Sequence, residues 1–238
     1  MGIKRGSITT SVVADGLVFN MDAANRASAI PSTSTNKAFN TINLSNSGSF
    51  VNDTIWDNNT PSSNFDSFAF DGTTDYIISN FQIGEILGGS ENNYTINVWY
   101  RQTDQTSYRA LVTKWYSYYM GINGTSILLN VGAGSGWGAE RYCTTSVANN
   151  TWINATVIRE RDRSTVDWYL NGVFQNAVSD STTTNSGTKK LYIGGYNNSG
   201  DYDAFQGNIG PIQMYNRALS ANEVLHNYNA LKGRFGLS

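Results

Sequence analysis

The chain contains 238 residues, of which 16 are Lys or Arg and 18 are Asp or Glu, so its formal net charge is −2 at pH 7. Charged residues make up 14% of the chain, against roughly 25% in an average soluble domain. The single His and single Cys exclude a His-rich metal site, a disulfide within the chain and a Cys-based zinc site. The charge argues against nucleic-acid binding, and no apolar run reaches the ~20 residues of a membrane span.

An N-terminal arm is predicted over residues 1–13, ahead of the first strand pattern. This segment lacks the apolar core of a signal peptide, and Gly6 stands where a myristoylation motif has Ser or Thr. We therefore expect a soluble protein made in a cytoplasm. The arm is either a disordered terminus or an attachment segment that orders on a partner. The residues that would contact such a partner are Ile3, Lys4, Arg5, Val12 and Val13.

The first strand is predicted over residues 16–22, where Leu17, Phe19 and Met21 share one face. Residues 24–64 are rich in Asn, Ser and Thr, but they carry too many apolar side chains for a linker. For this segment we expect long loops with short strands held against the main sheets.

The strongest strand signal covers residues 93–102, where two sets of side chains alternate. One face carries Tyr94, Ile96, Val98 and Tyr100, and the other carries Thr95, Asn97 and Trp99. Shorter strands punctuated by glycines are predicted around it, at 68–72, 76–78, 110–115, 118–122 and 127–131.

A tight hairpin is predicted at Asn171-Gly172, because both residues of such a turn need a positive φ and these two residue types tolerate it. Alternating strands flank the turn, and another covers residues 152–160. Further strands follow at 191–193 and 209–215. Regular short strands without intervening helices predict an all-β, two-sheet antiparallel sandwich.

One short helix is predicted at the C-terminal end of the chain. Ser220 and Glu223 have the spacing of a capping box, and Leu219 can pack on Val224. The predicted apolar stripe of this helix consists of Val224, Leu225, Tyr228 and Leu231, and Lys232-Gly233 marks its end. No domain boundary is visible, so residues 14–238 are expected to form a single domain.

Three segments resemble a known family: residues 16–25, residues 70–77, and residues 207–220 with the helix that follows. Together they resemble the concanavalin A-like, laminin-G-like jelly-roll domains of tailed-phage virion structural proteins, especially those of marine and cyanobacterial phages. The resemblance covers about residues 16–235, and its third segment is the most specific. It implies a jelly-roll sandwich of two sheets with the first strand near the last.

Catalysis is not expected. A glycosidase needs two carboxylates that flank the sugar, and the nearest approach to such a pair is Glu160 and Asp162. Two arginines interleave these acids, and a hairpin turn is expected there, so a solvated turn is the better interpretation. Neither a nucleophile motif nor a phosphate-binding loop is matched.

Two kinds of binding site have candidate residues. Calcium prefers clustered carboxylate, amide and carbonyl oxygens, and Asn197, Asp201 and Asp203 offer these in one loop, where an ordinary Asn/Asp turn is the alternative. No other cofactor is expected. A glycan would stack on exposed aromatic rings, for which the candidates in or near loops are Trp115, Tyr118, Trp137, Tyr142, Tyr196 and Tyr202.

The resemblance and the arm favour a non-enzymatic virion structural protein, a capsid decoration or fibre component on the surface of a phage particle. In this hypothesis the protein is made in the host cytoplasm, and the arm contacts other virion proteins, either major capsid or fibre subunits. The particle's symmetry then favours a homo-oligomer, a trimer or dimer. The alternative is a carbohydrate-binding adhesin, a tail fibre or a lectin-like cell-surface module, that takes a host surface glycan.

Overall fold

The computed structural model describes residues 11–25, 27–28, 37–52, 55–57, 67–82, 93–114, 117–133, 136–183, 189–196 and 203–238. Within these ranges the strands form two antiparallel sheets of eight, and their inner faces share one apolar core. This confirms the predicted all-β jelly-roll sandwich with one short C-terminal helix. No helix in the same ranges is both long enough and apolar enough to cross a membrane.

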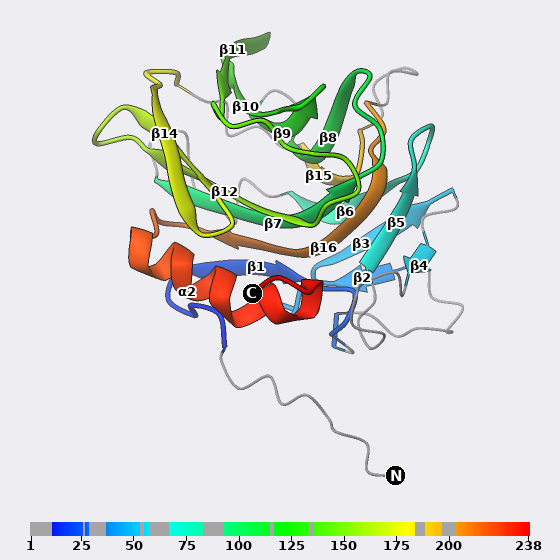
Figure 1. Cartoon of the computed structure of the whole chain (residues 1–238). Coiled ribbons are helices and arrows are strands. Elements are labelled where there is room, and N and C mark those ends of the chain that lie inside the picture. Colours follow the sequence, from blue (N-terminus) through cyan, green and yellow to red (C-terminus); the bar gives the residue numbers. More distant parts are fainter. Residues whose placement is uncertain are drawn as a thin grey trace.

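The two sheets lie one above the other in Figure 1, and the helix α2 (Ala221–Leu231) lies beneath the lower one. Sheet A, the lower sheet, runs in the order β14 (Val173–Ser179), β13 (Thr165–Leu170), β12 (Ile153–Glu160), β7 (Tyr94–Gln102), β16 (Gln206–Tyr215), β5 (Ser67–Asp71) and β4 (Ile55–Asp57), with β1 (Leu17–Met21) also paired to β16. Sheet B, the upper sheet, runs β11 (Gly136–Tyr142), β10 (Ser126–Ala133), β9 (Tyr118–Asn123), β8 (Tyr108–Lys114), β15 (Lys190–Ile193), β6 (Tyr76–Gln82), β3 (Ser47–Val51) and β2 (Lys37–Phe39). The short strands predicted within residues 24–64 are β2, β3 and β4.

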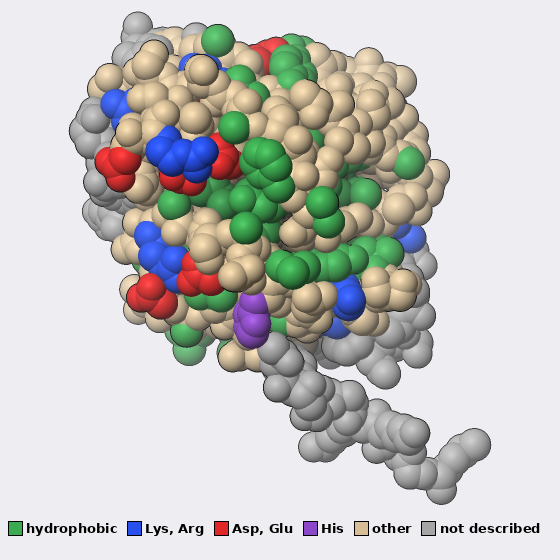
Figure 2. All heavy atoms as spheres, turned by 60° about the vertical axis from the view of Figure 1, so that its left-hand side comes forward, with side chains coloured by type: hydrophobic (Ala, Val, Ile, Leu, Met, Phe, Trp, Pro, Cys, Tyr) green, Lys and Arg blue, Asp and Glu red, His purple; other side chains and the backbone are tan. Residues whose placement is uncertain are grey.

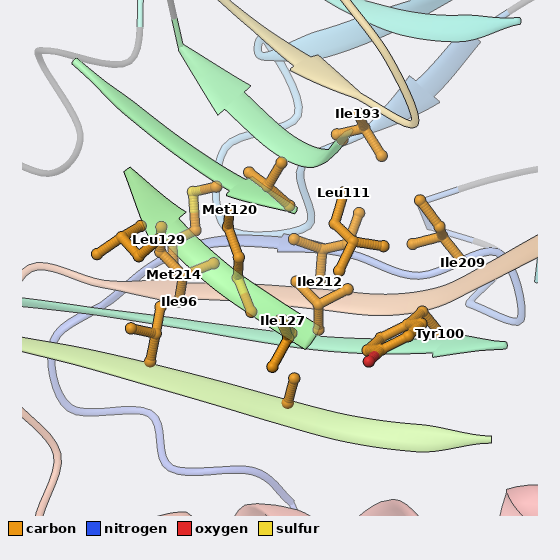
Figure 3. Packing of buried hydrophobic residues seen from close by; sticks show 14 of the residues in the cluster. Ile96, Tyr100, Leu111, Met120, Ile127, Leu129, Ile193, Ile209, Ile212 and Met214 are labelled. Carbon is orange, nitrogen blue, oxygen red and sulfur yellow. The ribbon is translucent and has the colours of Figure 1, made fainter. Parts of the chain in front are cut away.

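The core between the sheets consists of the inward-facing side chains of the strands, which alternate with outward-facing ones along each strand (Figure 3). On β7 the inward residues are the predicted set that begins with Tyr94 and ends with Tyr100. They face Leu111, Met120 and Leu129 from sheet B, all fully buried. Burying each large apolar side chain contributes roughly 1.5–3 kcal/mol, so this layer drives the association of the two sheets.

The outward face of β7 carries Trp99 beside the polar Thr95 and Asn97, and a third layer covers this tryptophan. Trp99 is fully buried and stacks between Tyr228 of α2 and Phe235 of the 3₁₀-helix η1 (Lys232–Phe235). The centroid of the Trp99 ring lies 5.7 Å from that of Tyr228 and 4.3 Å from that of Phe235. Trp152 joins the same cluster. The helical layer thus removes from water an indole that the two sheets alone would expose.

Strand β16 changes its partner midway. Its first half pairs with β5 up to Ile209, and its second half pairs with β1 from Ile212 onward. Gly210 and Pro211 lie at this switch, where the pairing with β7 is also irregular. Because Pro has no N–H to donate, it is tolerated in a central strand only at such an interruption.

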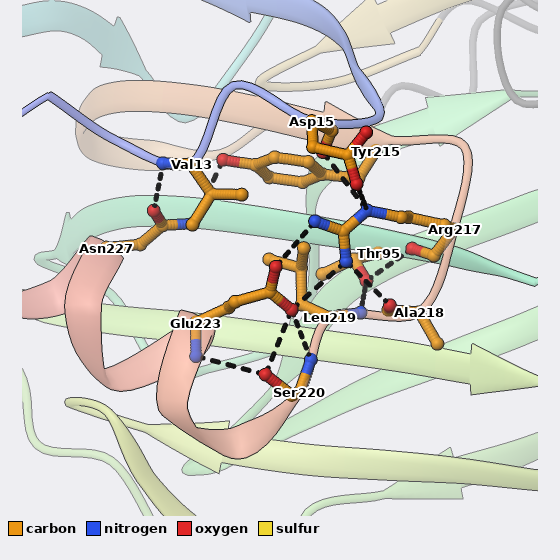
Figure 4. A network of polar contacts seen from close by, with 10 residues as sticks. All are labelled: Val13, Asp15, Thr95, Tyr215, Arg217, Ala218, Leu219, Ser220, Glu223 and Asn227. Atoms are coloured by element: carbon orange, nitrogen blue, oxygen red, sulfur yellow. Dashed lines mark hydrogen bonds and ion pairs between the residues drawn. The ribbon is translucent and has the colours of Figure 1, made fainter.

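The turn from β16 into α2 is held by a polar network (Figure 4). Ser220 and Glu223 form the predicted capping box. The guanidinium of Arg217 lies 2.6 Å from Glu223 Oε1 and 2.8 Å from Asp15 Oδ2. The Thr95 hydroxyl donates to the Arg217 carbonyl and accepts from the Leu219 N–H. This network ties the helix to the start of β1 and to β7.

Two details of the sequence prediction are wrong. Leu225 does not belong to the buried stripe of the helix: it is 43% exposed, because it follows Val224 by one residue and points 100° away from that face. Leu17 does not share a face with Phe19, because a bulge between them turns Leu17 toward the helical layer. The helical region also continues past the predicted end at Lys232, as the turn η1 that ends at Gly236.

The last residues of the predicted arm lie against α2. Val13 N–H donates to Asn227 Oδ1 over 2.8 Å, and His226 Nε2 lies 2.8 Å from the Ser11 carbonyl oxygen. Val12 and Val13 pack on the apolar clusters beneath sheet A. The other predicted contact residues of the arm, Ile3, Lys4 and Arg5, lie outside the described residues.

Replacing Glu223 by Gln keeps the capping geometry but removes the charge that faces Arg217. Arg217 lowers the pKa of Glu223 from 4.5 to about 2. The carboxylate therefore stabilises the fold above pH 4.5, and this contribution is lost as the pH falls toward 2. We expect E223Q to lower the free energy of unfolding by about 1 kcal/mol at neutral pH. Urea denaturation from acid to neutral pH should show the two proteins converging in acid, and a pH-independent difference would contradict this.

Candidate ligand-binding face

The two sheets differ in what covers their outer faces. The outer face of sheet A is covered by α2, η1 and residues 11–13. The outer face of sheet B carries an aromatic cluster, some of whose members are buried and others partly exposed. We call this cluster the tyrosine face; its described aromatic residues are Tyr108, Tyr119, Tyr142, Tyr192 and Tyr196.

Strand register brings these side chains to one surface. Leu128 lies between Gly121 of β9 and Tyr142 of β11, and it is fully buried beneath the rings. Ala110 pairs with Gly121 from the other side and is also fully buried. These side chains are shorter than a tyrosine, and Gly121 has none, so the tyrosines can lie across the sheet rather than stand away from it.

Gly121 is required by the close approach of a ring. A Cβ atom at this position would lie 2.3 Å from Tyr119 Cε1 and 2.6 Å from the Arg109 carbonyl oxygen. The Tyr119 ring therefore occupies the space above Gly121. Tyr196, from the loop after β15, meets Tyr119 edge to face with ring centroids 6.2 Å apart. Only a residue without a Cβ atom at position 121 leaves room for the Tyr119 ring.

Glu140 organises the part of the face over β8, β9 and β11. The Tyr108 hydroxyl donates to Glu140 Oε1 over 2.8 Å, and the Tyr142 hydroxyl donates to Glu140 Oε2 over 2.5 Å. Asn123 Nδ2 donates to the Tyr142 oxygen over 3.5 Å. The hydrogen bond to Glu140, followed by that to Tyr142, raises the pKa of Tyr108 far above its ordinary value. Both phenols thus stay protonated and donate their hydrogen bonds to the carboxylate.

A second carboxylate lies at the Tyr119 end of the face. Burial, and then the charge of Asp203, raise the pKa of Tyr119 well above its ordinary value. The Asp203 carbonyl accepts a hydrogen bond from the Ala110 N–H, which fixes this residue beside β8. The face therefore combines aromatic rings with carboxylate and amide groups, which is the chemistry that recognises a polyhydroxylated ligand.

The predicted glycan residues fall into three groups. Tyr142 and Tyr196 lie on the tyrosine face. Tyr118 is the wrong candidate, because it lies in the core between the sheets with its ring against Tyr94. Trp115 and Tyr202 lie outside the described residues, and of Trp137 only the backbone is described, in β11.

Sequence reasoning did not assign Tyr108, Asn123, Asn130 or Glu140 to the face. All four lie at outward positions of β8 to β11, on the same side as Tyr119 and Tyr142. The available signal was alternation: Leu128 and Asn130 are two residues apart, as are Glu140 and Tyr142. Alternation separates the two faces of a strand but does not say which face points outward.

The remaining predicted sites stand as follows. Of the calcium candidates, Asn197 and Asp201 lie outside the described residues, and Asp203 lies beside Tyr119. Among residues that the structure describes, no three His, Cys, Asp or Glu side chains gather as a metal site would need. Glu160 pairs with Arg163, and Asp162 accepts from Asn93, so both lie in the hairpin turn that the sequence predicts.

A second exposed surface lies where β14 meets α2. Val173 is 60% exposed, Phe174 50% and Leu225 43%. Figure 2 brings this side forward and shows hydrophobic side chains flanked by acidic and basic ones. Strand β14 is an edge strand of sheet A. Its surface differs from the tyrosine face because no carboxylate belongs to the strand.

Residues 71–225 match the family model described as the concanavalin A-like lectin/glucanases superfamily. This match covers more than half of the chain. No curated protein matches the chain.

Several solved structures are similar in fold. The binding domain of Paraclostridial Mosquitocidal Protein 1 gives a TM-score of 0.68 at 13% identity over 90% of this chain. The binding domain of Botulinum Neurotoxin DC in complex with SialylT gives 0.68 at 11% identity over 91%. The chain spans 52% of each of those two structures. Domain 4 of AbnA, a GH43 extracellular arabinanase from Geobacillus stearothermophilus, in complex with arabinotriose, gives 0.64 at 15% identity, with 89% of this chain and 98% of that one covered.

Replacing Gly121 by Ala should force the Tyr119 ring and the Arg109 carbonyl apart. We expect the free energy of unfolding to fall by about 1–3 kcal/mol, as overpacking does in other cores. Gly136→Ala is the matched control, because a Cβ atom there meets nothing within 4 Å. Urea denaturation of the two variants measures the difference, and equal stabilities would contradict this account of the packing at Gly121.

Proposed function

This chain belongs to the concanavalin A-like lectin/glucanases superfamily, and we propose that it is a non-enzymatic carbohydrate-binding module whose site is the tyrosine face. The observation that carries the proposal is the asymmetry of the sandwich. One outer sheet face is covered by the chain's own helical layer, whereas the other presents the partly exposed rings of Tyr108 and Tyr142 around Glu140. Aromatic rings stack on the apolar faces of sugars, and carboxylate and amide groups bond to their hydroxyls.

The similar structures support a binding role. Two are binding domains, of Mosquitocidal Protein 1 and of a botulinum neurotoxin in complex with SialylT, and a third is an arabinanase domain in complex with arabinotriose. Those ligands belong to those proteins. For this chain they favour a saccharide among the polyhydroxylated ligands that the tyrosine face could accept.

The chemistry of the face favours binding over hydrolysis. Both oxygens of Glu140 accept phenol protons, so this carboxylate is engaged in positioning rings. The other acid, Asp203, is held beside β8, whereas Glu140 lies on β11 beyond β9 and β10. A glycosidase needs two carboxyl groups that act across one glycosidic bond, whereas Glu140 is already engaged by two phenols.

We also propose the setting in which the module works. The resemblance of residues 16–25, 70–77 and 207–220 to phage proteins supports a virion surface protein, a capsid decoration or fibre component. The contacts of Val12 and Val13 with the layer beneath sheet A support attachment from that side. The tyrosine face then points away from the particle. Repetition of the attachment site by particle symmetry favours a homo-oligomer.

Binding to a glycan array and then by calorimetry tests the site. Tyr108→Ala should weaken binding of the best glycan at least tenfold, because it removes both a stacking ring and a hydrogen bond to Glu140. Phe174→Ala is the matched control, since it truncates an exposed aromatic residue on β14, outside the tyrosine face.

Unchanged affinity in the Tyr108 variant, with its melting temperature retained, would place the glycan elsewhere and contradict the proposed site. Equal losses in the Tyr108 and Phe174 variants would do the same.

Attachment through the arm is tested with a variant that lacks residues 2–10 and keeps the contacts of Ser11 and Val13 with α2. We expect its melting temperature to stay unchanged and its binding to purified phage particles from the source culture to be lost. Particle binding equal to that of the full chain would contradict the role of the arm. Gold labelling of particles by antibody distinguishes head from tail.

A further inference from the structure

At the centre of the tyrosine face, the hydroxyl hydrogens of Tyr108 and Tyr142 are already used in hydrogen bonds within the protein. Each phenol has one O–H, and those of Tyr108 and Tyr142 both point to the oxygens of Glu140. What this group of three side chains presents to a ligand is therefore a set of oxygen lone pairs. A ligand that hydrogen-bonds to these three side chains has to bring donors of its own.

Asn130 adds a further acceptor at the same place. It pairs with Glu140 across β10 and β11, and with Tyr119 across β10 and β9. Its Oδ1 atom is buried and has no hydrogen-bond partner among the described residues. An unpaired buried carbonyl is costly, so a rotation of the Asn130 side chain that brings Oδ1 to a ligand hydroxyl relieves this cost.

The charges around this centre have one sign. Glu140 and Asp203 are the carboxylates that act on its tyrosines. Arg141 neighbours Glu140 in the chain, but its guanidinium lies 2.7 Å from Asp180 on the inner side of the sheet, and it is buried. Arg109 is engaged with Asp104.

The lysines on the outer face of sheet B are farther from Glu140. Lys190 lies on β15 and Lys37 on β2, on the far side of β8 from the strand that carries Glu140. Among the described residues, no cation is therefore available beside Glu140 to neutralise an acidic group on a ligand.

We infer that the tyrosine face selects uncharged glycans and rejects acidic ones. The inference rests on the proposed function and specifies its ligand class. Sugar hydroxyls donate to Glu140, to Asn130 and to the phenol oxygens, while the tyrosine rings stack on the sugar faces. A carboxylate, sulfate or phosphate on the glycan would bring only acceptors and a like charge to Glu140. The discrimination is built into the donor and acceptor pattern, so the binding of an uncharged glycan should be insensitive to salt.

The test uses pairs of glycans that share a backbone and differ only in charge. Sialyllactose is compared with lactose, and acidic polysaccharides are compared with their carboxyl-reduced forms, by calorimetry at low and high salt. For each backbone that is bound, we expect the uncharged member to bind at least tenfold more tightly. In Glu140→Gln this ratio should fall toward one, because the like charge is removed and an amide donor is introduced.

Glu160→Gln is the matched control, since it makes the same charge change in the hairpin turn beside Arg163. It should keep the wild-type ratio. If Glu140→Gln does not fold, as judged by its melting temperature, the ratio measured with the wild-type chain decides the question alone.

The outcomes separate the inference from the proposed function. Acidic members that bind as tightly as their uncharged partners, with binding lost in Tyr108→Ala, would overturn the inference and support the site. An unchanged ratio in folded Glu140→Gln would overturn the role of Glu140. No binding of any glycan, charged or uncharged, would contradict the proposed function itself and the inference with it.

Discussion

The fold depends on one constraint: β7 carries a core-forming face on one side and Trp99 on the other, so the strand has to be covered on both sides. Its inward side chains pack against sheet B, whereas Trp99 on the outward face needs a separate cover. The chain supplies that cover from its two ends, as α2 with η1 and as residues 11–13. The Arg217 network fixes this layer, because one guanidinium joins Asp15 near the start of β1 to Glu223 in the first turn of α2. The irregularity of β16 at Pro211 also contributes, because β1 pairs with the part of β16 that follows it.

On the opposite side, no helix of the described residues covers the outer face of sheet B. Its outer face is not simply polar, because tyrosines lie over a floor of Ala110, Gly121 and Leu128. A folded domain could hide such rings beneath a loop or a partner copy. Here the phenol groups of Tyr108 and Tyr142 are instead organised by Glu140, which holds them in place while their rings stay partly exposed. Preorganised rings lose little entropy when a ligand stacks on them, and this is the physical basis of the proposed binding role.

Local signals in the sequence predicted the fold well. The alternation of β7, the capping box at Ser220 and the Asn171-Gly172 turn each follow from the geometry of a few neighbouring residues, and the two turn residues do have positive φ. The failures involve longer range. The bulge after Leu17 depends on how β1 pairs with β16. Tyr118 and Tyr119 could be assigned to opposite faces from sequence, but which of them enters the core depends on the stacking of the two sheets. Glu140 was missed for the same reason, since one of its two tyrosine partners, Tyr108, lies 32 positions away in the sequence.

The central claim is that ligand binds on the outer face of sheet B and not at the helical layer or at β14. The most direct measurement is a backbone amide NMR titration of the labelled chain with a glycan that it binds. The account predicts that the shifted resonances gather on β8 to β11, at Tyr108, Tyr119, Asn130 and Glu140, while α2 and β14 stay unchanged. Shifts confined to α2, β14 or the turn at Glu160 would contradict it.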